Sequence, residues 1–355
     1  MKEFNIEVLA INAGKDLKYI SGLDFHLSER PVVLFIPAED VSALVYPAFE
    51  TTKAESSKME LQLFPYQEDS STWIAVFKEA ISETAITDTS IGVSPGSLRF
   101  LELDLIQSAL EHKNVFSAEG VFRQLYIQKD ETAVNAIRES VRVAENAFTN
   151  MLPNIKPGKT EKQIANELII SLLREGSEPD LPFEPIIASG PNSANPHATP
   201  SDRILENGDV LIVDWGARHN GYVSDMTRSF LIGKANEEFK MIAQIIKQAN
   251  QTARDMIKPG IEAREIDTAA RNHIVKSGFG EYFTHRTGHG IGLEEHENPY
   301  ISQSSEEILD SGMSFTIEPG IYIPGKGGIR IEDNVIVTQD GHETLTSLPR
   351  DLTVI

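Results

Sequence analysis

The chain has 355 residues, of which 40% are hydrophobic and 24% charged, enough for a globular core and for two domains. Its formal net charge of −21 opposes binding to a phosphate backbone, so we expect no nucleic-acid partner. It has no cysteine, which excludes disulfides and thiolate chemistry, so any metal must be held by oxygen and imidazole nitrogen.

The sequence contains no apolar run long enough to span a bilayer, which takes about 18 residues. The first residues, 1–7, contain two acids where a signal peptide would be basic and then apolar. We therefore expect no membrane partner and a cytoplasmic location.

Residues 1–127 are predicted to form a small α/β domain. Apolar runs predict its strands, and amphipathic segments that alternate with them predict its helices, which indicates a mainly parallel or mixed sheet. The loop around Asp24 and His26 is interpreted as ordinary surface, and we find no catalytic constellation in this domain. The expected strands are 6–11, 31–37, 42–45 and 91–93, and the expected helices are 16–22, 71–82 and 99–110.

A second domain is predicted over residues 128–355. Asp130 is a good N-cap, and apolar residues recur at three- and four-residue steps from Val134 to Met151. This spacing predicts one long amphipathic helix, which Pro153 ends.

The second domain contains an internal repeat. The segment 155–158, Ile-Lys-Pro-Gly, recurs at 257–260, and Asp214 and Glu318 stand at equivalent points of the two copies. Two copies are too few for a solenoid. We therefore expect an α/β (α+β) domain in which two halves face each other across a pseudo-twofold axis, with sheets inside and helices outside.

Asp214 lies in the expected strand 209–216. A turn signal at His219, Asn220 and Gly221 follows, and Asp225 lies in the expected second strand, 222–227. If the loop is centred between His219 and Asn220, the two acids pair directly; if it is Asn220-Gly221, they are diagonal on the same face. Like charges repel in either register, and a divalent cation reverses that sign. The alternative is an exposed acidic pair, which the apolar segment 211–213 argues against.

The second half repeats this arrangement. A loop centred on Gly325 places Glu318 opposite Glu332, which alternates with isoleucine and valine and is therefore expected in a buried strand. His289 lies between glycines in the stretch 285–293, which by itself fits an incidental histidine in a glycine-rich turn equally well. His285 belongs to no His-Glu-x-x-His motif and is given only a supporting role.

Four carboxylates and one imidazole therefore have placements that allow them to meet. Such an oxygen-rich set suits Mn²⁺, Co²⁺, Fe²⁺ or Zn²⁺ in a reactive site better than a structural zinc site. The four negative charges balance two divalent ions, whereas one ion would leave two carboxylates surplus. The candidate ligands are Asp214, Asp225, His289, Glu318 and Glu332.

Five ordered motifs resemble the creatinase and aminopeptidase family of pita-bread metallopeptidases (M24), and within it the Xaa-Pro dipeptidases (prolidases) and Xaa-Pro aminopeptidases. They run in order through the second domain, and the tail 348–352 also resembles the family's end. The matching segments are 213–216, 224–228, 285–292, 317–322 and 330–333.

The resemblance implies a role for each matching residue. All five candidates would be metal ligands, with Asp225 and Glu332 bridging two ions, and Glu318 would also take the proton from the nucleophilic water. Taken alone, His197 would be interpreted as a loop histidine and His296 as a surface histidine. The remaining implied roles are holding the substrate's peptide group (His197), stabilising the tetrahedral intermediate (His296) and lying near Glu332 (Arg330).

The resemblance also implies the activity: a dinuclear metal-dependent exopeptidase that hydrolyses the Xaa-Pro bond, with Mn²⁺ or Co²⁺ favoured over Zn²⁺ or Fe²⁺. The expected substrate is a peptide with proline at its second position. We favour a prolidase; the alternatives are an Xaa-Pro aminopeptidase for longer peptides and an inactive pita-bread binding module. A homodimer is the family expectation. The family's N-terminal domain usually opens with a helix, which we expect to be absent or very short here, because the first strand begins almost at Met1.

Overall fold

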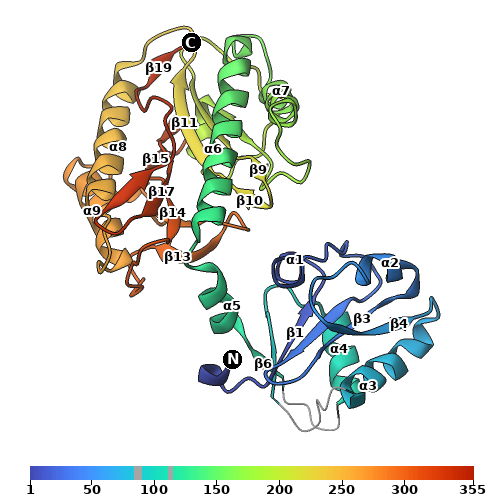
Figure 1. Ribbon diagram of the computed structural model, residues 1–355. Helices are drawn as coiled ribbons and strands as arrows, with labels where there is room; N and C mark the ends of the chain where they lie inside the picture. The colour runs from blue at the N-terminus through green and yellow to red at the C-terminus, as the bar shows by residue number, and fades with distance from the viewer. Residues whose placement is uncertain (84–89, 111–114) are drawn as a thin grey trace. The chain divides into compact units, whose positions relative to one another are not determined.

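The computed structural model describes residues 1–83, 90–110 and 115–355 (Figure 1). These residues form two compact units, Met1–Leu125 and Tyr126–Ile355. None of the helices in the described ranges combines the length and the apolar character needed to cross a bilayer.

The N-terminal unit is built on a six-stranded sheet of order β4-β3-β2-β1-β5-β6. Strands β1, β2 and β3 pair antiparallel, whereas the β3–β4, β1–β5 and β5–β6 pairs are parallel, so the predicted mixed sheet is confirmed. One 3₁₀ turn, Lys2–Phe4, precedes β1. The strands are β1 (Val8–Asn12), β2 (Val33–Pro37), β3 (Ser42–Pro47), β4 (Leu61–Tyr66), β5 (Ile91–Val93) and β6 (Val115–Ser117).

Strand β4 was not predicted from the sequence. It lies at the edge of the sheet and buries only Phe64 and Tyr66, and it contains Pro65, which an edge strand tolerates because its N–H need not pair. An edge strand with so few buried positions lacks the apolar run by which its neighbours were found. The helices of this unit are α1 (Lys15–Ser21), α2 (Thr51–Ala54), α3 (Trp73–Glu83), α4 (Phe100–Ala109) and α5 (Glu119–Tyr126), which reaches the boundary.

The C-terminal unit contains four long helices. The predicted helix is α6 (Glu131–Met151), and the side chain of Asp130 caps it by accepting a hydrogen bond from the Ala133 N–H. Its apolar stripe packs against β9 and β10 and against the next helix, α7. The other helices of this unit are α7 (Glu161–Arg174), α8 (Glu237–Asp255) and α9 (Ala263–Lys276).

The two halves of the internal repeat each contribute one sheet. The first has the order β19-β11-β8-β7 and the second β13-β12-β14-β17-β18, with β9–β10 and β15–β16 as separate hairpins. Equivalent backbone bridges, Thr160 with Ile204 and Glu262 with Ile308, stand at the start of α7 and α9. The strands are β7 (Ile186–Ser189), β8 (Val210–Trp215), β9 (Arg218–His219), β10 (Tyr222–Val223), β11 (Met226–Leu231), β12 (Gly288–Gly290), β13 (Glu297–Ile301), β14 (Ser314–Ile317), β15 (Gly320–Ile323), β16 (Gly327–Arg330), β17 (Asp333–Val337), β18 (His342–Thr344) and β19 (Thr353–Val354).

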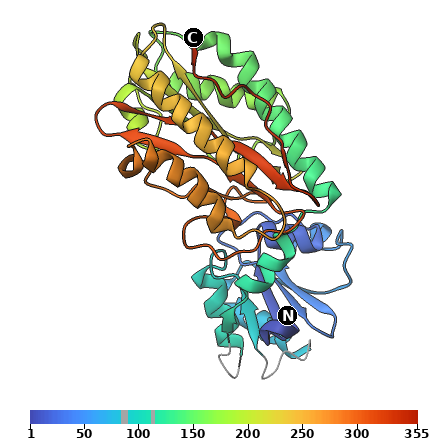
Figure 2. The ribbon, with the colours of Figure 1, turned by 90° about the vertical axis from the view of Figure 1, so that its left-hand side faces the viewer.

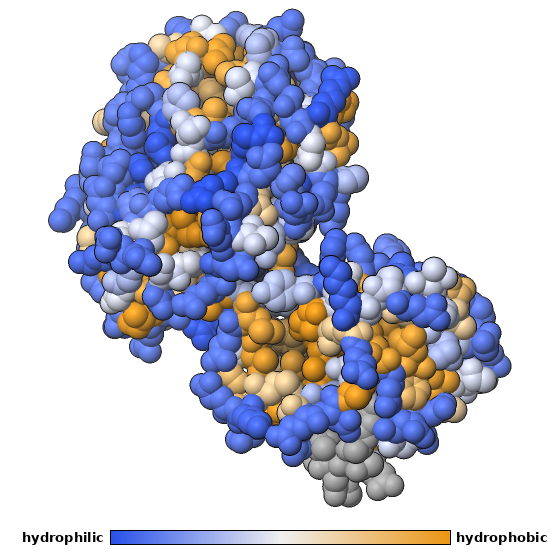
Figure 3. Space-filling model, viewed as in Figure 1, coloured by the Kyte–Doolittle hydropathy of each residue, from blue (hydrophilic) through white to orange (hydrophobic). Residues whose placement is uncertain are grey.

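Helices cover the outside of the strands, as the repeat predicted. Figures 1 and 2 show α6 and α7 in green and α8 and α9 in orange, with the red and yellow strands of the C-terminal unit between the two pairs. One apolar core lies under each pair, around Trp215 on the first side and Phe315 on the second. The space-filling view of Figure 3 shows mostly hydrophilic side chains over this unit. In contrast to the polar side chains on the surface, a second set of polar side chains is buried between the two cores.

Candidate metal centre

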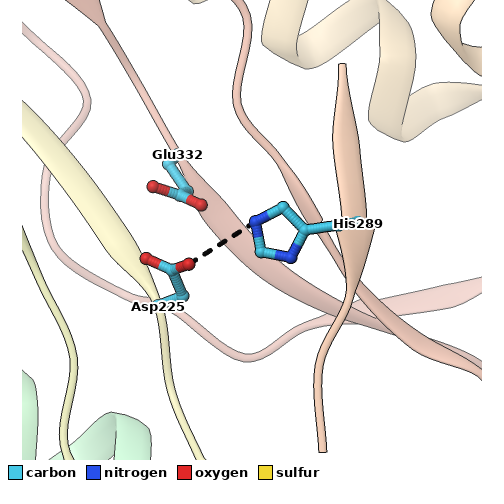
Figure 4. Close-up of side chains that lie close together, drawn as sticks. All are labelled: Asp225, His289 and Glu332. Atoms are coloured by element: carbon cyan, nitrogen blue, oxygen red, sulfur yellow. Dashed lines mark ion pairs between the residues drawn. The ribbon is translucent and has the colours of Figure 1, made fainter. Parts of the chain in front are cut away.

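Asp225, His289 and Glu332 point toward one another in the interior of the C-terminal unit (Figure 4). Each offers a ligand atom within 4.8 Å of the others, and all three are buried. Glu318 joins them, because its Oε1 lies 3.4 Å from His289 Nε2, while Asp225 Oδ2 lies 3.6 Å from the same nitrogen. The fold thus gathers three carboxylates around one imidazole.

The first hairpin takes the diagonal register. Its loop is Asn220-Gly221, with φ of 50° and 79°, and His219 pairs with Tyr222. The predicted register in which the two aspartates pair directly is therefore wrong. Asp214 pairs with Thr227, and Asp225 lies two residues before Thr227. The reason is the turn type, since Asn-Gly is the pair that best tolerates two successive positive φ angles in a two-residue hairpin.

The second hairpin has the predicted register. Gly320 pairs with Arg330 and Ile323 with Gly327, so that the loop is centred on Gly325. Glu318 and Glu332 stand just beyond the paired residues, at the same end of the hairpin. The two hairpins differ in loop length, yet both place their acidic residues in the same cluster.

His289 is held in a strand rather than in a turn. Its strand, β12, lies between β13 and β14. A Cβ on Gly288 would overlap the carbonyl oxygen of Thr316, and one on Gly290 would overlap that of Asn298. The glycines beside the histidine are therefore required by the close approach of the neighbouring backbones.

Asp214 stands outside the tight group of three. Its Oδ2 accepts a hydrogen bond of 2.6 Å from Arg330 Nη2. Its Oδ1, like Oδ1 of Asp225, is buried and has no hydrogen-bond partner among the described residues. Buried polar atoms are normally paired, so two unpaired carboxylate oxygens point to a missing positive ligand.

The electrostatics agree. Burial and the charges of neighbouring carboxylates raise the pKa of Asp225 and of Glu332 well above their usual range, and burial raises the pKa of Glu318 to about 7. Burial also lowers the pKa of His289, which leaves a neutral imidazole able to act as a ligand. This donor set fits divalent cations, which would relieve the repulsion and occupy the unpaired oxygens.

Arg330 connects the cluster to the surrounding structure. Its Nε donates to Thr227 Oγ1 at 2.9 Å, and its Nη1 donates to Tyr322 OH at 2.8 Å and to the Pro196 carbonyl at 3.2 Å. The Thr227 hydroxyl in turn donates to Glu332 Oε2 at 2.7 Å. The Arg330 side chain is 3% exposed, and four hydrogen bonds hold its guanidinium.

Thr227 and Tyr322 were missed as functional residues. Tyr322 lies four residues after Glu318, and strand alternation could have placed both on one face. Thr227 lies two residues after Asp225 by the same rule. Tyr322 also contacts His285, whose Nε2 is 2.9 Å from the phenol oxygen and whose Nδ1 is 3.9 Å from Glu318 Oε2.

A cavity of about 520 Å³ opens onto the cluster. His197 and His296 both line it and are exposed, and the ring of His296 stands edge-on to that of His289 at 4.2 Å. Arg286 and Glu295 line it too. The structure therefore brings every predicted site residue to one cavity, lined by Asp214, Asp225, His197, His289, His296, Glu318, Arg330 and Glu332.

A second layer of buried charges supports the cluster from behind. Arg228 donates to the Glu332 carbonyl and to Asp333 Oδ1, and Arg350 donates to Asp333 Oδ2. The buried ammonium of Lys129 pairs with Glu297, which directly follows His296.

Comparisons with known proteins agree with this geometry. Residues 135–339 match the metallopeptidase family M24, and residues 1–125 match the creatinase/prolidase N-terminal domain. An Xaa-Pro dipeptidase of Pyrococcus horikoshii is 40% identical over 263 residues, 74% of each chain. A crystal structure of a dipeptidase from the same organism has a TM-score of 0.93 and 34% identity, covering 100% of this chain and 97% of its own. An X-Pro aminopeptidase of Thermotoga maritima has a TM-score of 0.87 and 31% identity, with 100% and 97% covered.

Proposed function

The chain belongs to the metallopeptidase family M24, and on that premise we propose that it is a dinuclear exopeptidase that hydrolyses Xaa-Pro dipeptides. The observation that carries the proposal is the buried group of Asp225, His289 and Glu332, with Glu318 beside it and unpaired carboxylate oxygens on Asp214 and Asp225. Burying like charges in this way costs folding free energy, and bound cations would remove that cost.

The residues that would hold two ions are Asp214, Asp225, His289, Glu318 and Glu332. Two bound divalent ions lower the pKa of water and polarise a peptide carbonyl. Mn²⁺ or Co²⁺ fits best, because the set holds four carboxylates and a single imidazole.

We assign proton transfer, substrate binding and the positioning of the carboxylates to residues of the chain itself. Glu318 accepts the proton of the attacking water, and its position beside His289 and His285 keeps it within the cavity. His197 and His296, on the exposed part of the wall, hold the peptide group and stabilise the tetrahedral oxygen. Arg330 fixes the carboxylate of Asp214 and, through Thr227, that of Glu332.

The substrate class rests on the similarity to relatives that are named Xaa-Pro dipeptidases. The similarity to an X-Pro aminopeptidase keeps longer peptides as the second candidate. We also propose a homodimer that works in the cytoplasm; sedimentation of the purified protein tests the first part and cell fractionation the second.

The test is hydrolysis of Xaa-Pro dipeptides and Xaa-Pro-Yaa tripeptides by the purified protein, after chelation and after restoring Mn²⁺ or Co²⁺. We expect metal-dependent cleavage of the dipeptides. Cleavage of the tripeptides as well would move the assignment to an Xaa-Pro aminopeptidase. No cleavage of either by the metal-loaded protein would refute the proposed substrate.

A further inference from the structure

Glu161 is a buried carboxylate that the proposed mechanism does not use. It is the first residue of α7, it is 0% exposed, and it lies outside the lining of the cavity. The helix is capped without it, because Thr160 and Gln163 form a capping box at its start. Since burying a carboxylate costs free energy unless its oxygens are satisfied, its partners show what it does.

All its side-chain hydrogen bonds come from one stretch, residues 189–201, which we call the His197 segment. The Oε1 atom of Glu161 accepts from the Ser189 N–H and from the Ser189 hydroxyl, both at 2.7 Å. Its Oε2 accepts from the Ser201 N–H at 3.0 Å and from the Ser201 hydroxyl at 2.6 Å. The Asn192 amide donates to both oxygens at 3.1 Å. One carboxylate thus joins the first and last residues of the segment.

The His197 segment forms part of the cavity wall. Its consecutive residues 196–200 all line the cavity, and His197 is among them. The segment begins with the end of β7 and the 3₁₀ helix η5 (Gly190–Ala194), and residues 195–200 then continue as bend, turn and coil. Because no regular ladder of backbone hydrogen bonds holds residues 195–200, the place of His197 depends on how the segment is attached.

The middle of the segment contacts β16, the strand that ends with Arg330. The Pro196 carbonyl accepts from Arg330 Nη1 at 3.2 Å, and the Gly328 N–H donates to Ser193 Oγ at 2.9 Å. A Cβ on Gly328 would lie 2.3 Å from the Ser193 carbonyl oxygen, so the two backbones are in direct contact. The segment is therefore held by β16 in its middle and by Glu161 at its two ends.

The second half of the repeat contains a comparable arrangement. Asp267 of α9 is also 0% exposed, and its Oδ1 accepts from the Thr287 N–H at 3.0 Å and from the Thr287 hydroxyl at 2.9 Å. Thr287 lies two residues before His289. The repeat aligns Glu161 with Ala263, so the two acids stand at different points of their helices. Each half nevertheless uses a buried acid of its outer helix to hold a stretch that carries a histidine of the site.

We propose that Glu161 is a positioning residue, which joins the two ends of the His197 segment and thereby fixes His197 at the cavity. This inference rests on the proposed function, in which His197 holds the peptide group of the substrate. Glu161 itself touches no reacting atom in this account. Its effect on hydrolysis passes through the histidine.

Glu161→Gln is the informative variant. Its amide offers one acceptor oxygen and turns an NH₂ group toward N–H and hydroxyl donors, so the bonds at one end of the segment are lost. The Lys162 N–H still donates to the Ser201 carbonyl at 3.1 Å, so α7 stays attached to the segment and the variant is expected to fold. Glu161→Asp keeps the charge and both acceptor oxygens but has a shorter reach, so its effects should be smaller.

Glu167→Gln is the matched control. This glutamate lies on the same helix, pairs with Lys159 at 2.7 Å and has a side chain that is 35% exposed. The substitution is chemically the same as in Glu161→Gln and leaves the His197 segment untouched. The control should therefore behave like the wild type in both of the measurements that follow.

Hydrogen–deuterium exchange of the Mn²⁺-loaded protein tests the attachment without reference to activity. In Glu161→Gln we expect faster amide exchange in peptides that cover residues 190–200, and wild-type exchange in peptides that cover β14. Exchange in residues 190–200 that is as slow as in the wild type would overturn the proposal.

A double-mutant cycle with His197→Ala tests whether Glu161 acts through the histidine. In the wild-type background we expect Glu161→Gln to lower kcat/KM for Ala-Pro about 10-fold, the scale of one misplaced hydrogen bond. In the His197→Ala background the same change should lower it less than about 2-fold, because residues that act through one another are not additive. Losses that multiply in full would show a merely structural role and overturn the positioning of His197.

The two measurements separate this inference from the proposed function. A wild type that hydrolyses Ala-Pro while Glu161→Gln matches it in exchange and in kcat/KM would overturn the role of Glu161 and leave the proposed function standing. A wild type that cleaves no Xaa-Pro peptide would refute the proposed function and the catalytic part of this inference. Faster exchange in Glu161→Gln would even then support the attachment of the segment by Glu161.

Discussion

Glu332 and Asp333 are consecutive, buried carboxylates that meet opposite surroundings. Burial and the charges of Glu318 and Asp214 raise the pKa of Glu332 well above its usual range. Burial would do the same at Asp333, but Arg228 and the hydrogen bond from Arg350 lower the pKa of that carboxyl to about 2. Glu332 lies in the link before β17 and Asp333 is the first residue of that strand; the first side chain faces carboxylates and the second faces arginines.

The contrast between Glu332 and Asp333 distinguishes a carboxylate that stabilises the fold from one that is available to bind metal. Asp333 is fully compensated by side chains, with Arg254 at 3.8 Å as a third cation, and it ties β17 to the C-terminal tail. Within the described residues, the Glu332 carboxylate accepts one hydrogen bond, from the hydroxyl of Thr227. Several arginines surround the Asp333 carboxylate, whereas in the described parts of the chain Asp214 is the one cluster carboxylate that pairs with an arginine, Arg330. We interpret the remaining negative charge as the part reserved for metal ions.

Replacing the uncompensated carboxylate should have the largest effect on activity. Glu332→Gln keeps the shape but removes one carboxylate that we propose as a metal ligand, so we expect peptide hydrolysis to fall more than about 100-fold, beyond the loss typical of a residue that only supports a ligand. In the metal-free protein the same change relieves repulsion and should not lower the midpoint of urea unfolding. Wild-type activity in this variant would contradict the view that the uncompensated carboxylate is the one required for hydrolysis.

Replacing the compensated carboxylate should mainly affect stability. Asp333→Asn leaves Arg228 and Arg350 without the carboxylate charge that neutralises them, and breaking a buried pair costs about 3–5 kcal/mol of unfolding free energy. Urea denaturation of the metal-free protein measures this cost. A variant as stable as the wild type would show that the arginines are not needed to keep this charge buried.

Thr227 sharpens the comparison, because it is the one side-chain donor to Glu332 in the described chain and also accepts from Arg330. Thr227→Val is nearly isosteric, and we expect metal affinity to fall about 10- to 100-fold, as for other outer-shell partners. Competition with a chelator of known affinity measures the change. An unaltered affinity would mean that the hydroxyl does not orient this ligand.

The smallest effect is expected where a charge pair is solvated. Arg138 and Glu343 pair at 2.5 Å with both side chains more than 40% exposed. Arg138→Gln should change the unfolding free energy by about 0–1 kcal/mol. A loss as large as that of Asp333→Asn would contradict the view that burial decides the cost.

The sequence predicted the elements that carry the site better than the contacts that support it. Alternation and turn signals located the strand that bears Asp214, whereas Asp225 and Glu332, expected within strands, lie in the short links β10–β11 and β16–β17. One of the two registers left open for the first hairpin is the observed one. The glycines beside His289 were noted, but their reason, close packing between β13 and β14, appears only in three dimensions.

The surroundings of Asp333 could not have been predicted. Its partners Arg228, Arg254 and Arg350 come from three distant parts of the chain, and no local period relates them. Motif order therefore predicted which residues meet in the cluster, whereas the charge compensation around them required the structure.

The most direct test of the central claim, that the uncompensated carboxylates are there for two cations, is the number of ions bound per chain. Metal-free protein would be titrated with Mn²⁺ in a calorimeter, and the metal content after dialysis would be measured by mass spectrometry. We predict two ions per chain in the wild type and fewer in Glu332→Gln. One ion or none in the wild type, with the protein folded, would contradict the claim.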